Sequence, residues 1–344
     1  MLPPPFDDTG MPVRLGSPLR TPCYAWPKWG ISYQDETERE TLVEASEQCY
    51  RSEWDQTSQT GHEEIAAAAK EAGLGDANAR LNAAIGQTIN SLVGSSEERS
   101  LRILDLGAGA GATSLAVLEA LKKLPCVGDL TLVDPAAKAL EHAGQALTAF
   151  QSSQPFEFRL VRETDRSFLS SAAPSSFNLI VSGAAIHHHS DIRPILALCV
   201  RSLEPGGTIV IGDWHNSMWE HPRRVLKLLE CMEWPNKADA IRRFQQAFAI
   251  TDEAPSTTPE ENRANAQIMA FWTAYGRLHR SSTDPFLILE GHRPVQRYVE
   301  DLLATGFDVP QHAAGSQPNP RFLLSDSGLL AVTVAIRPLS KSNG

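Results

Sequence analysis

The chain has 344 residues and a formal net charge of −10, with 31 Lys and Arg against 41 Asp and Glu. This acidic balance argues against a large contact surface for nucleic acid or for an anionic membrane, because such binding depends on Lys and Arg that neutralise phosphates. The five cysteines form no C-x-x-C pair, which argues against a zinc knuckle and a disulfide framework. No apolar run reaches about eighteen residues, and no basic region precedes an apolar stretch at the N-terminus. We therefore expect a cytoplasmic protein without a membrane span, and a small partner.

Residues 1–95 are predicted to form an N-terminal helical arm with cap helices. Residues 1–34 are rich in Pro and Gly with interleaved aromatic side chains, which indicates an extended segment. A charged helical pattern follows over 35–72, with Gly61 as a break, and a second helix is expected over 78–92.

The middle of the chain, residues 96–215, alternates apolar strand patterns with helical patterns. Such alternation is typical of an α/β fold, in which helices wrap a parallel sheet. The expected strands are 102–106, 130–133, 157–161, 177–182 and 208–212, and the expected helices are 112–123, 136–150 and 192–203. Residues 293–344 are expected to complete this core with a helix over 294–305 and a strand over 329–336.

An insertion over residues 216–292 separates the fifth predicted strand from the rest of the core. Helices are expected over 222–234, 237–248 and 259–280, and they carry more large aromatic side chains than one exposed face needs. We interpret the insertion as a lid that closes over an acceptor. Its aromatic residues could equally form a second core or a homodimer interface. The candidate acceptor-binding residues are Trp214, Trp272 and Tyr275.

A glycine-rich turn follows the first predicted strand in Leu104-Asp105-Leu106-Gly107-Ala108-Gly109-Ala110-Gly111-Ala112-Thr113. Such a turn lets a ligand approach the backbone closely, and the helix that it opens offers unpaired N–H groups to a negative group. Gly107, Gly109 and Ala112 also satisfy the dinucleotide pattern G-x-G-x-x-G/A. Asp105 favours a different ligand, because a carboxylate two residues before the first glycine would repel a pyrophosphate. It suits S-adenosylmethionine, which carries a sulfonium and an ammonium.

A second acid, Asp134, ends the second predicted strand in Leu132-Val133-Asp134-Pro135. This position allows Asp134 to accept hydrogen bonds from ribose hydroxyls, as in other doubly wound nucleoside sites. Dinucleotide sites use such an acid too, so Asp134 does not discriminate between the two ligands. Asp-Pro also initiates turns, which is the structural alternative.

Four segments in this order resemble the class I S-adenosylmethionine-dependent methyltransferases, over roughly residues 100–215 and 293–337. They are the glycine turn with Asp105, the acid Asp134, the segment 177–188 and Leu203-Glu204-Pro205-Gly206-Gly207 leading into 208–213. The resemblance implies a Rossmann-like sheet and S-adenosylmethionine as the cofactor, bound through Asp105, Gly107, Gly109, Gly111 and Asp134. It also implies an acid for the adenine amine after the third strand. Asp165 is the nearest match and Glu163 its substitute, although the usual preceding glycine is missing.

Candidate catalytic residues follow the fourth and fifth predicted strands, because ligands in such sheets bind beyond the carboxyl ends of the strands. His187 and His188 follow the fourth strand, and Asp213 and His215 follow the fifth. A histidine is a suitable base near neutral pH for a hydroxyl or ammonium acceptor. The histidine pair is also compatible with a purely structural role in the loop.

A metal site is not expected, because His187, His189 and Asp191 form a local cluster without distant ligands. The N/D-P-P-Y/F motif that grips a flipped base and a Pro-Cys pair are both absent after the fourth strand, which argues against base methylation. The sequence therefore predicts an enzyme that methylates O, N or C of a small metabolite in specialised metabolism. Three alternatives stay open: a rearrangement without methyl transfer, a catalytically silent partner subunit, and a nicotinamide-dependent oxidoreductase.

Overall fold

The computed structural model of the chain describes residues 60–94, 99–122, 124–151, 156–189, 192–214, 222–231, 258–278, 295–310, 321–323 and 330–339, with single positions 238, 241, 242 and 245. The chain divides into two compact units. The sheet unit comprises 77–186, 192–214 and 295–344, and the helical unit comprises 1–76, 187–191 and 215–294. None of the described helices combines the length and the apolar character needed to cross a membrane.

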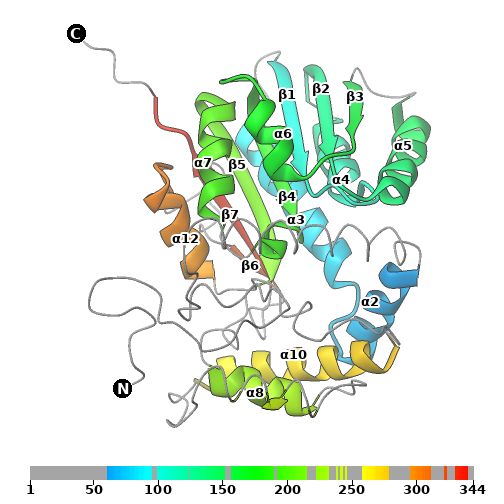
Figure 1. Ribbon diagram of the computed structural model, residues 1–344. Coiled ribbons are helices and arrows are strands. Elements are labelled where there is room, and N and C mark those ends of the chain that lie inside the picture. The colour runs from blue at the N-terminus through cyan, green and yellow to red at the C-terminus, as the bar shows by residue number, and fades with distance from the viewer. Residues whose placement is uncertain are drawn as a thin grey trace. The chain divides into compact units, whose positions relative to one another are not determined.

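The sheet unit contains a seven-stranded sheet with the order β3-β2-β1-β4-β5-β7-β6 (Figure 1). Its strands are β1 (Arg99–Leu106), β2 (Cys126–Val133), β3 (Phe156–Val161), β4 (Phe177–Gly183), β5 (Leu203–Trp214), β6 (Arg321–Leu323) and β7 (Leu330–Ile336). The first five strands are parallel, whereas β7 pairs antiparallel with both β5 and β6. The strand order reverses between β1 and β4. Loops that leave the carboxyl ends of these two strands therefore diverge, which is where open α/β sheets bind ligands.

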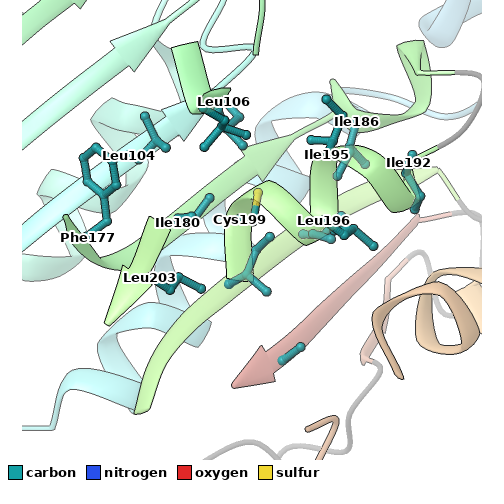
Figure 2. Packing of buried hydrophobic residues seen from close by; sticks show 14 of the residues in the cluster. Leu104, Leu106, Phe177, Ile180, Ile186, Ile192, Ile195, Leu196, Cys199 and Leu203 are labelled. Carbon is teal, nitrogen blue, oxygen red and sulfur yellow. The ribbon is translucent and has the colours of Figure 1, made fainter. Parts of the chain in front are cut away.

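Side chains of successive residues in β1 lie on opposite faces of the sheet. Leu104 and Leu106 are buried in the main hydrophobic cluster, which also contains Ile195 and Leu196 from helix α7 (Arg193–Ser202). Figure 2 shows these residues packed together with Cys199 of the same helix. Asp105 lies between the two leucines in sequence, so its side chain lies on the other face.

Helices flank the sheet in two groups. The first group is α3 (Ala77–Val93), α4 (Ala112–Leu121) and α5 (Ala137–Gln151), in which α4 contacts both others. The second group is α6 (Asp165–Ser171), α7 and α12 (Val295–Ala304), in which α7 contacts both others. A Cβ at Gly86 of α3 would lie 2.7 Å from the Ala116 carbonyl oxygen of α4. Glycine at this position therefore permits the close approach of the two helices.

The helical unit contains α2 (Thr60–Glu71), α8 (Pro222–Cys231) and α10 (Pro259–Leu278) among its described residues. Helix α10 contacts both α2 and α8. The Thr273 hydroxyl donates a hydrogen bond to the Cys231 carbonyl oxygen at 3.3 Å, which joins α10 to the end of α8. Leu228, Ile268 and Phe271 are buried, so these helices have an apolar core of their own.

The predicted α/β class is confirmed, and most predicted elements have their counterparts. Strands β2 and β5 begin earlier than expected, at Cys126 and Leu203. Their first halves carry Gly128 and Pro205-Gly206-Gly207, which obscure the apolar strand pattern. Helix α6 and strand β6 were not predicted, because seven and three residues are too short for a periodicity to emerge.

One further prediction needs correction at the N-terminal side. Helix α2 begins at Thr60, next to the predicted break at Gly61, and the helical stretch expected before it lies outside the described residues. Helix α3, grouped from sequence with the cap helices, belongs to the sheet unit. The predicted arm over 1–34 and most of the predicted helix over 237–248 lie outside the described residues.

Candidate functional site

The glycine turn lies directly after β1, at the point where the strand order reverses. Gly107, Gly109 and Gly111 have φ angles of 65°, 51° and 82°, a left-handed conformation that favours glycine. A Cβ at Gly107 would lie 2.4 Å from the Ala185 Cβ, and one at Gly111 would lie 3.0 Å from the Ala143 Cβ. Two of the three glycines are therefore required by both backbone conformation and space. Gly109 has no atom within 4 Å of a Cβ position, so only its conformation requires glycine.

Asp105 is fully buried at the end of β1. Its Oδ2 accepts a hydrogen bond from the Ser114 hydroxyl of α4 at 2.6 Å, and its Oδ1 has no partner among the described residues. Burial raises the pKa of Asp105 to about 7, the Ser114 hydrogen bond opposes this rise, and the negative charges of Asp134 and Asp165 add to it. Asp134 and Asp165 thus lie close enough to act on Asp105, although the three acids are far apart in the sequence.

Asp134 follows β2 and is buried. Its Oδ2 accepts a hydrogen bond from the Gly109 N–H at 2.8 Å, and its Oδ1 accepts one from the Ala136 N–H at 2.8 Å. The second contact caps the turn before α5, as the Asp-Pro alternative suggests. The first ties Asp134 to the glycine turn, where a cofactor acid is expected.

Asp165 is the first residue of α6 and is also buried. Its Oδ1 accepts a hydrogen bond from the Gly107 N–H at 3.2 Å. Thr164 caps the helix by accepting a hydrogen bond from the Ser167 N–H at 3.2 Å. Glu163, which is half-buried, accepts a hydrogen bond from the hydroxyl of the exposed Ser167 at 3.0 Å. Of these two candidate adenine acids, Asp165 is the one that contacts the glycine turn.

The chemistry of this set fits a cationic nucleoside. Three acidic side chains lie around the glycine turn, and no side chain caps the helix N-terminus at Gly111. The same site therefore offers negative charge and a helix N-terminus. The buried, unpartnered Oδ1 of Asp105 needs a cationic or hydrogen-bonding group nearby. An ammonium or a sulfonium meets that need, whereas a pyrophosphate would add negative charge.

Gly183, at the end of β4, packs closely against residues of α3 and α4 beside the glycine turn. A Cβ at Gly183 would lie 2.2 Å from the Thr113 Oγ1 and 3.2 Å from the Asn82 Oδ1. The Thr113 hydroxyl donates a hydrogen bond to that Asn82 oxygen at 2.9 Å. The glycine at the end of β4 therefore leaves the space in which α3 and α4 make their polar contact. Asn82 was not among the residues singled out from sequence.

Asp213 lies at the end of β5 and is 2% exposed. Its Oδ1 accepts a hydrogen bond from the Trp214 N–H at 2.8 Å, and its Oδ2 accepts one from the Tyr298 hydroxyl at 2.8 Å. Sequence reasoning missed Tyr298, because it belongs to a helix that follows the long insertion. The roles of Asp213 and Trp214 toward the acceptor stay predictions. His215 lies outside the described residues.

His187 and His188 form a 3₁₀ turn with Ile186. Their ring centroids are 4.2 Å apart, at a tilt of 50°. His187 is buried and His188 is half-buried, and both belong to the helical unit. Their proposed role as bases stays a prediction. Within the described part of the chain, no group of three or more His, Cys, Asp or Glu is arranged to hold a metal ion.

The lid candidates Trp272 and Tyr275 lie on α10. Both rings contact Phe271: its centroid lies 5.4 Å from that of Trp272 and 6.0 Å from that of Tyr275, the latter pair being stacked. Trp272 and Phe271 are buried and Tyr275 is half-buried. The cluster is thus at least partly a core of the helical unit. The alternative of a second core, left open by the sequence, has direct support in these contacts.

Comparison with known proteins finds a family match in the middle of the chain. Residues 104–209 match the family model described as a methyltransferase domain, and this range includes the glycine turn, Asp134 and Asp165. This match to a methyltransferase domain agrees with the family that the motifs resemble.

Several relatives share this region. The chain is 28% identical over 170 residues to the highly reducing polyketide synthase Preu5 of Preussia isomera. This alignment covers 48% of this chain and 6% of that protein. It is 28% identical over 132 residues to methyltransferase ucsB of an Acremonium species, which covers 37% of this chain and 46% of the other. A solved methyltransferase structure from Methanosarcina mazei aligns with a TM-score of 0.42 at 18% identity, covering 73% of this chain and 97% of the other. The chain thus spans less than half the length of these two sequence relatives.

Proposed function

We propose that this chain transfers a methyl group from S-adenosylmethionine to O, N or C of a small acceptor in specialised metabolism. The observation that carries the proposal is the cluster of Asp105, Asp134 and Asp165 at the glycine turn, whose negative charge suits the cationic donor. The similarity to a polyketide synthase and to a methyltransferase supports specialised metabolism. The acidic balance of the chain supports a small acceptor over nucleic acid.

In this proposal each part of the site has a defined task. The donor supplies an electrophilic methyl group on a sulfonium. Asp105 and Asp134 compensate the positive charge and hold ribose hydroxyls, the helix N-terminus at Gly111 receives the carboxylate of the donor, and Asp165 fixes the turn through Gly107. A hydroxyl or ammonium acceptor must also lose a proton, for which His187, His188 and His215 are the proposed bases. Asp213, with both oxygens already hydrogen-bonded, is better suited to orient the end of β5.

The donor assignment is tested by calorimetry with S-adenosylmethionine, S-adenosylhomocysteine and a nicotinamide dinucleotide. We expect both nucleosides to bind and the dinucleotide to bind more weakly. Tighter binding of the dinucleotide would overturn the assignment and restore the oxidoreductase alternative.

Methyl transfer is tested with methyl-labelled donor and metabolite extracts. We expect label in a product that is heavier by one CH₂ than its precursor. A product of unchanged mass would indicate a rearrangement, and no product at all would leave a silent partner subunit as the better description. A cytoplasmic location is part of the same proposal. The described cysteines Cys126, Cys199 and Cys231 are free thiols, which is compatible with a reducing compartment.

The lid is tested by Trp272→Phe compared with Trp272→Ala. If residues 216–292 close over the acceptor, both changes should alter turnover or acceptor preference while the affinity for the donor stays within a few-fold. If Trp272 only fills the core of the helical unit, Trp272→Ala should cost about 3 kcal/mol of stability, and Trp272→Phe should retain normal kinetics. Thermal unfolding measured beside acceptor kinetics separates the two outcomes.

A further inference from the structure

Asp105 combines complete burial with an incomplete set of hydrogen bonds. One oxygen accepts from Ser114, and the other has no partner among the described residues. The charged groups that act on it are Asp134 after β2 and Asp165 at the start of α6. The facing residue of the neighbouring strand β4 is Val181, which carries no charge. Among the described residues, the charged groups that act on Asp105 are therefore both negative.

This arrangement disfavours a negative charge on Asp105. A buried carboxylate with two acidic neighbours and hydrogen bonds from Ser114 alone is stabilised by taking up a proton, because the neutral acid needs less solvation and is not repelled. Near neutral pH the two protonation states then have similar free energies. A small change in the charge nearby is enough to shift the balance between them.

The methyl donor and the spent product of the proposed reaction differ in this charge. The donor carries a sulfonium, whereas the product carries a neutral thioether with the same adenosine and amino-acid groups. A sulfonium beside the cluster would favour the ionised form of Asp105, and the thioether would not.

We propose that Asp105 determines the selectivity of this site for the cationic methyl donor over its demethylated product, by exchanging one proton with solvent. The Asp105 carboxylic acid releases its proton when the donor binds, and the carboxylate takes a proton back from solvent once the sulfonium has become a thioether. No electrons are exchanged. This inference rests on the proposed function, because it concerns the same cofactor site.

The exchange has a defined pH dependence. Below about pH 7 donor binding must deprotonate Asp105, so donor affinity should rise by up to about tenfold per pH unit and level off above that pH. Product affinity should change less over the same range. The preference for donor over product should therefore grow as the pH rises from about 6 to about 8.

Calorimetry in buffers of different ionisation enthalpy measures the proton directly. For the wild-type chain we expect the release of most of one proton per donor at about pH 6 and little release at about pH 8, with less release for the product at both. Donor binding without proton release at about pH 6 would overturn the inference and leave the proposed function intact. No donor binding at any pH would instead contradict the proposed function.

Two variants and a control sharpen the test. Asp105→Asn should abolish the proton release and reduce the preference for donor over product by about tenfold or more at pH 8. Ser114→Ala removes the hydrogen bond that stabilises the ionised form, and should move the pH dependence of donor affinity to higher pH. Asp129→Asn, at an exposed position of β2, is the matched control and should change neither quantity.

If Asp105→Asn does not fold, the wild-type proton count and Ser114→Ala decide the question. An unchanged pH dependence in Ser114→Ala would count against Asp105 as the group that titrates.

Discussion

Asp105 and Asp213 are two buried acids at the carboxyl ends of two parallel strands, and their surroundings differ sharply. Asp213 has a hydrogen bond on each oxygen, one from the backbone of Trp214 and one from Tyr298. Asp105 has one oxygen without a partner and two acidic neighbours. A buried acid whose two oxygens both accept hydrogen bonds from the protein stabilises the fold. A buried acid with an oxygen that lacks a donor can gain one from a bound ligand. Burial alone does not tell these two roles apart.

Asp213→Ala is expected to have the largest effect, which is a loss of stability. This change leaves the Tyr298 hydroxyl and the Trp214 N–H without their acceptor in a buried place, so it should lower the free energy of unfolding by about 2–4 kcal/mol. Chemical denaturation at constant pH measures it. If stability is unchanged and only acceptor turnover falls, Asp213 acts on the acceptor and the contrast with Asp105 disappears.

Asp134→Ala should weaken binding of the donor by about 1–3 kcal/mol, because ribose hydrogen bonds to the carboxylate are lost. The structure adds a second cause, since the Gly109 N–H loses its acceptor and the glycine turn loosens. Calorimetry measures the affinity, and circular dichroism verifies that the fold is retained. Unchanged affinity would place the ribose contact elsewhere, with Asp165 as the next candidate.

Asp105→Asn should stabilise the chain at about pH 8, by roughly 1–3 kcal/mol, and do much less at about pH 4. The pKa of Asp105 is raised from 3.8 to about 7 in the folded chain, so the folded state holds the proton more tightly than the unfolded state. The free energy of unfolding of the wild type therefore falls as the pH rises from about 4 to about 7, and stays low above that. Urea unfolding of both proteins across this range tests the sign. A variant that is less stable than wild type at every pH would mean that the charged form is favoured.

Tyr298→Phe, which removes one hydroxyl and keeps the ring, is expected to have the smallest effect on stability. Asp213 retains its hydrogen bond from Trp214, so the loss should be about 1 kcal/mol. Thermal unfolding beside Asp213→Ala, and the double variant, give the coupling between the two residues. Additive losses would show that the Tyr298–Asp213 hydrogen bond contributes nothing to stability.

The positions of the glycine turn after β1 and of Asp134 after β2 could be predicted because their signals are local, and their roles in cofactor binding stay predictions. The turn from Asp105 to Gly111 and the acid Asp134 lie within short stretches whose spacing identifies them. Ser114 and Tyr298 could not be singled out in the same way. Ser114 is one of many small residues on α4, and it matters only because the helix places it 2.6 Å from Asp105. Tyr298 reaches Asp213 across a separation that no local pattern encodes.

For the helical unit, the sequence was less informative about the role of individual residues. Its aromatic content was visible from sequence, but the meaning of Trp272 and Tyr275 depends on which rings they face. The stack of Tyr275 on Phe271 and the burial of Trp272 arise from spacing along α10, which a composition argument does not resolve.

The place of β7 in the sheet has a consequence for how the chain is made. Strand β7 lies between β5 and β6 and pairs with β5 from Thr208 to Trp214, although the insertion separates the two in the chain. During synthesis the apolar edge of β5 therefore has no strand to pair with until residues 330–336 leave the ribosome. An unpaired apolar edge is a template for association with other chains. A truncated product that ends within the insertion would expose this edge, and its release from the ribosome would favour aggregation over folding.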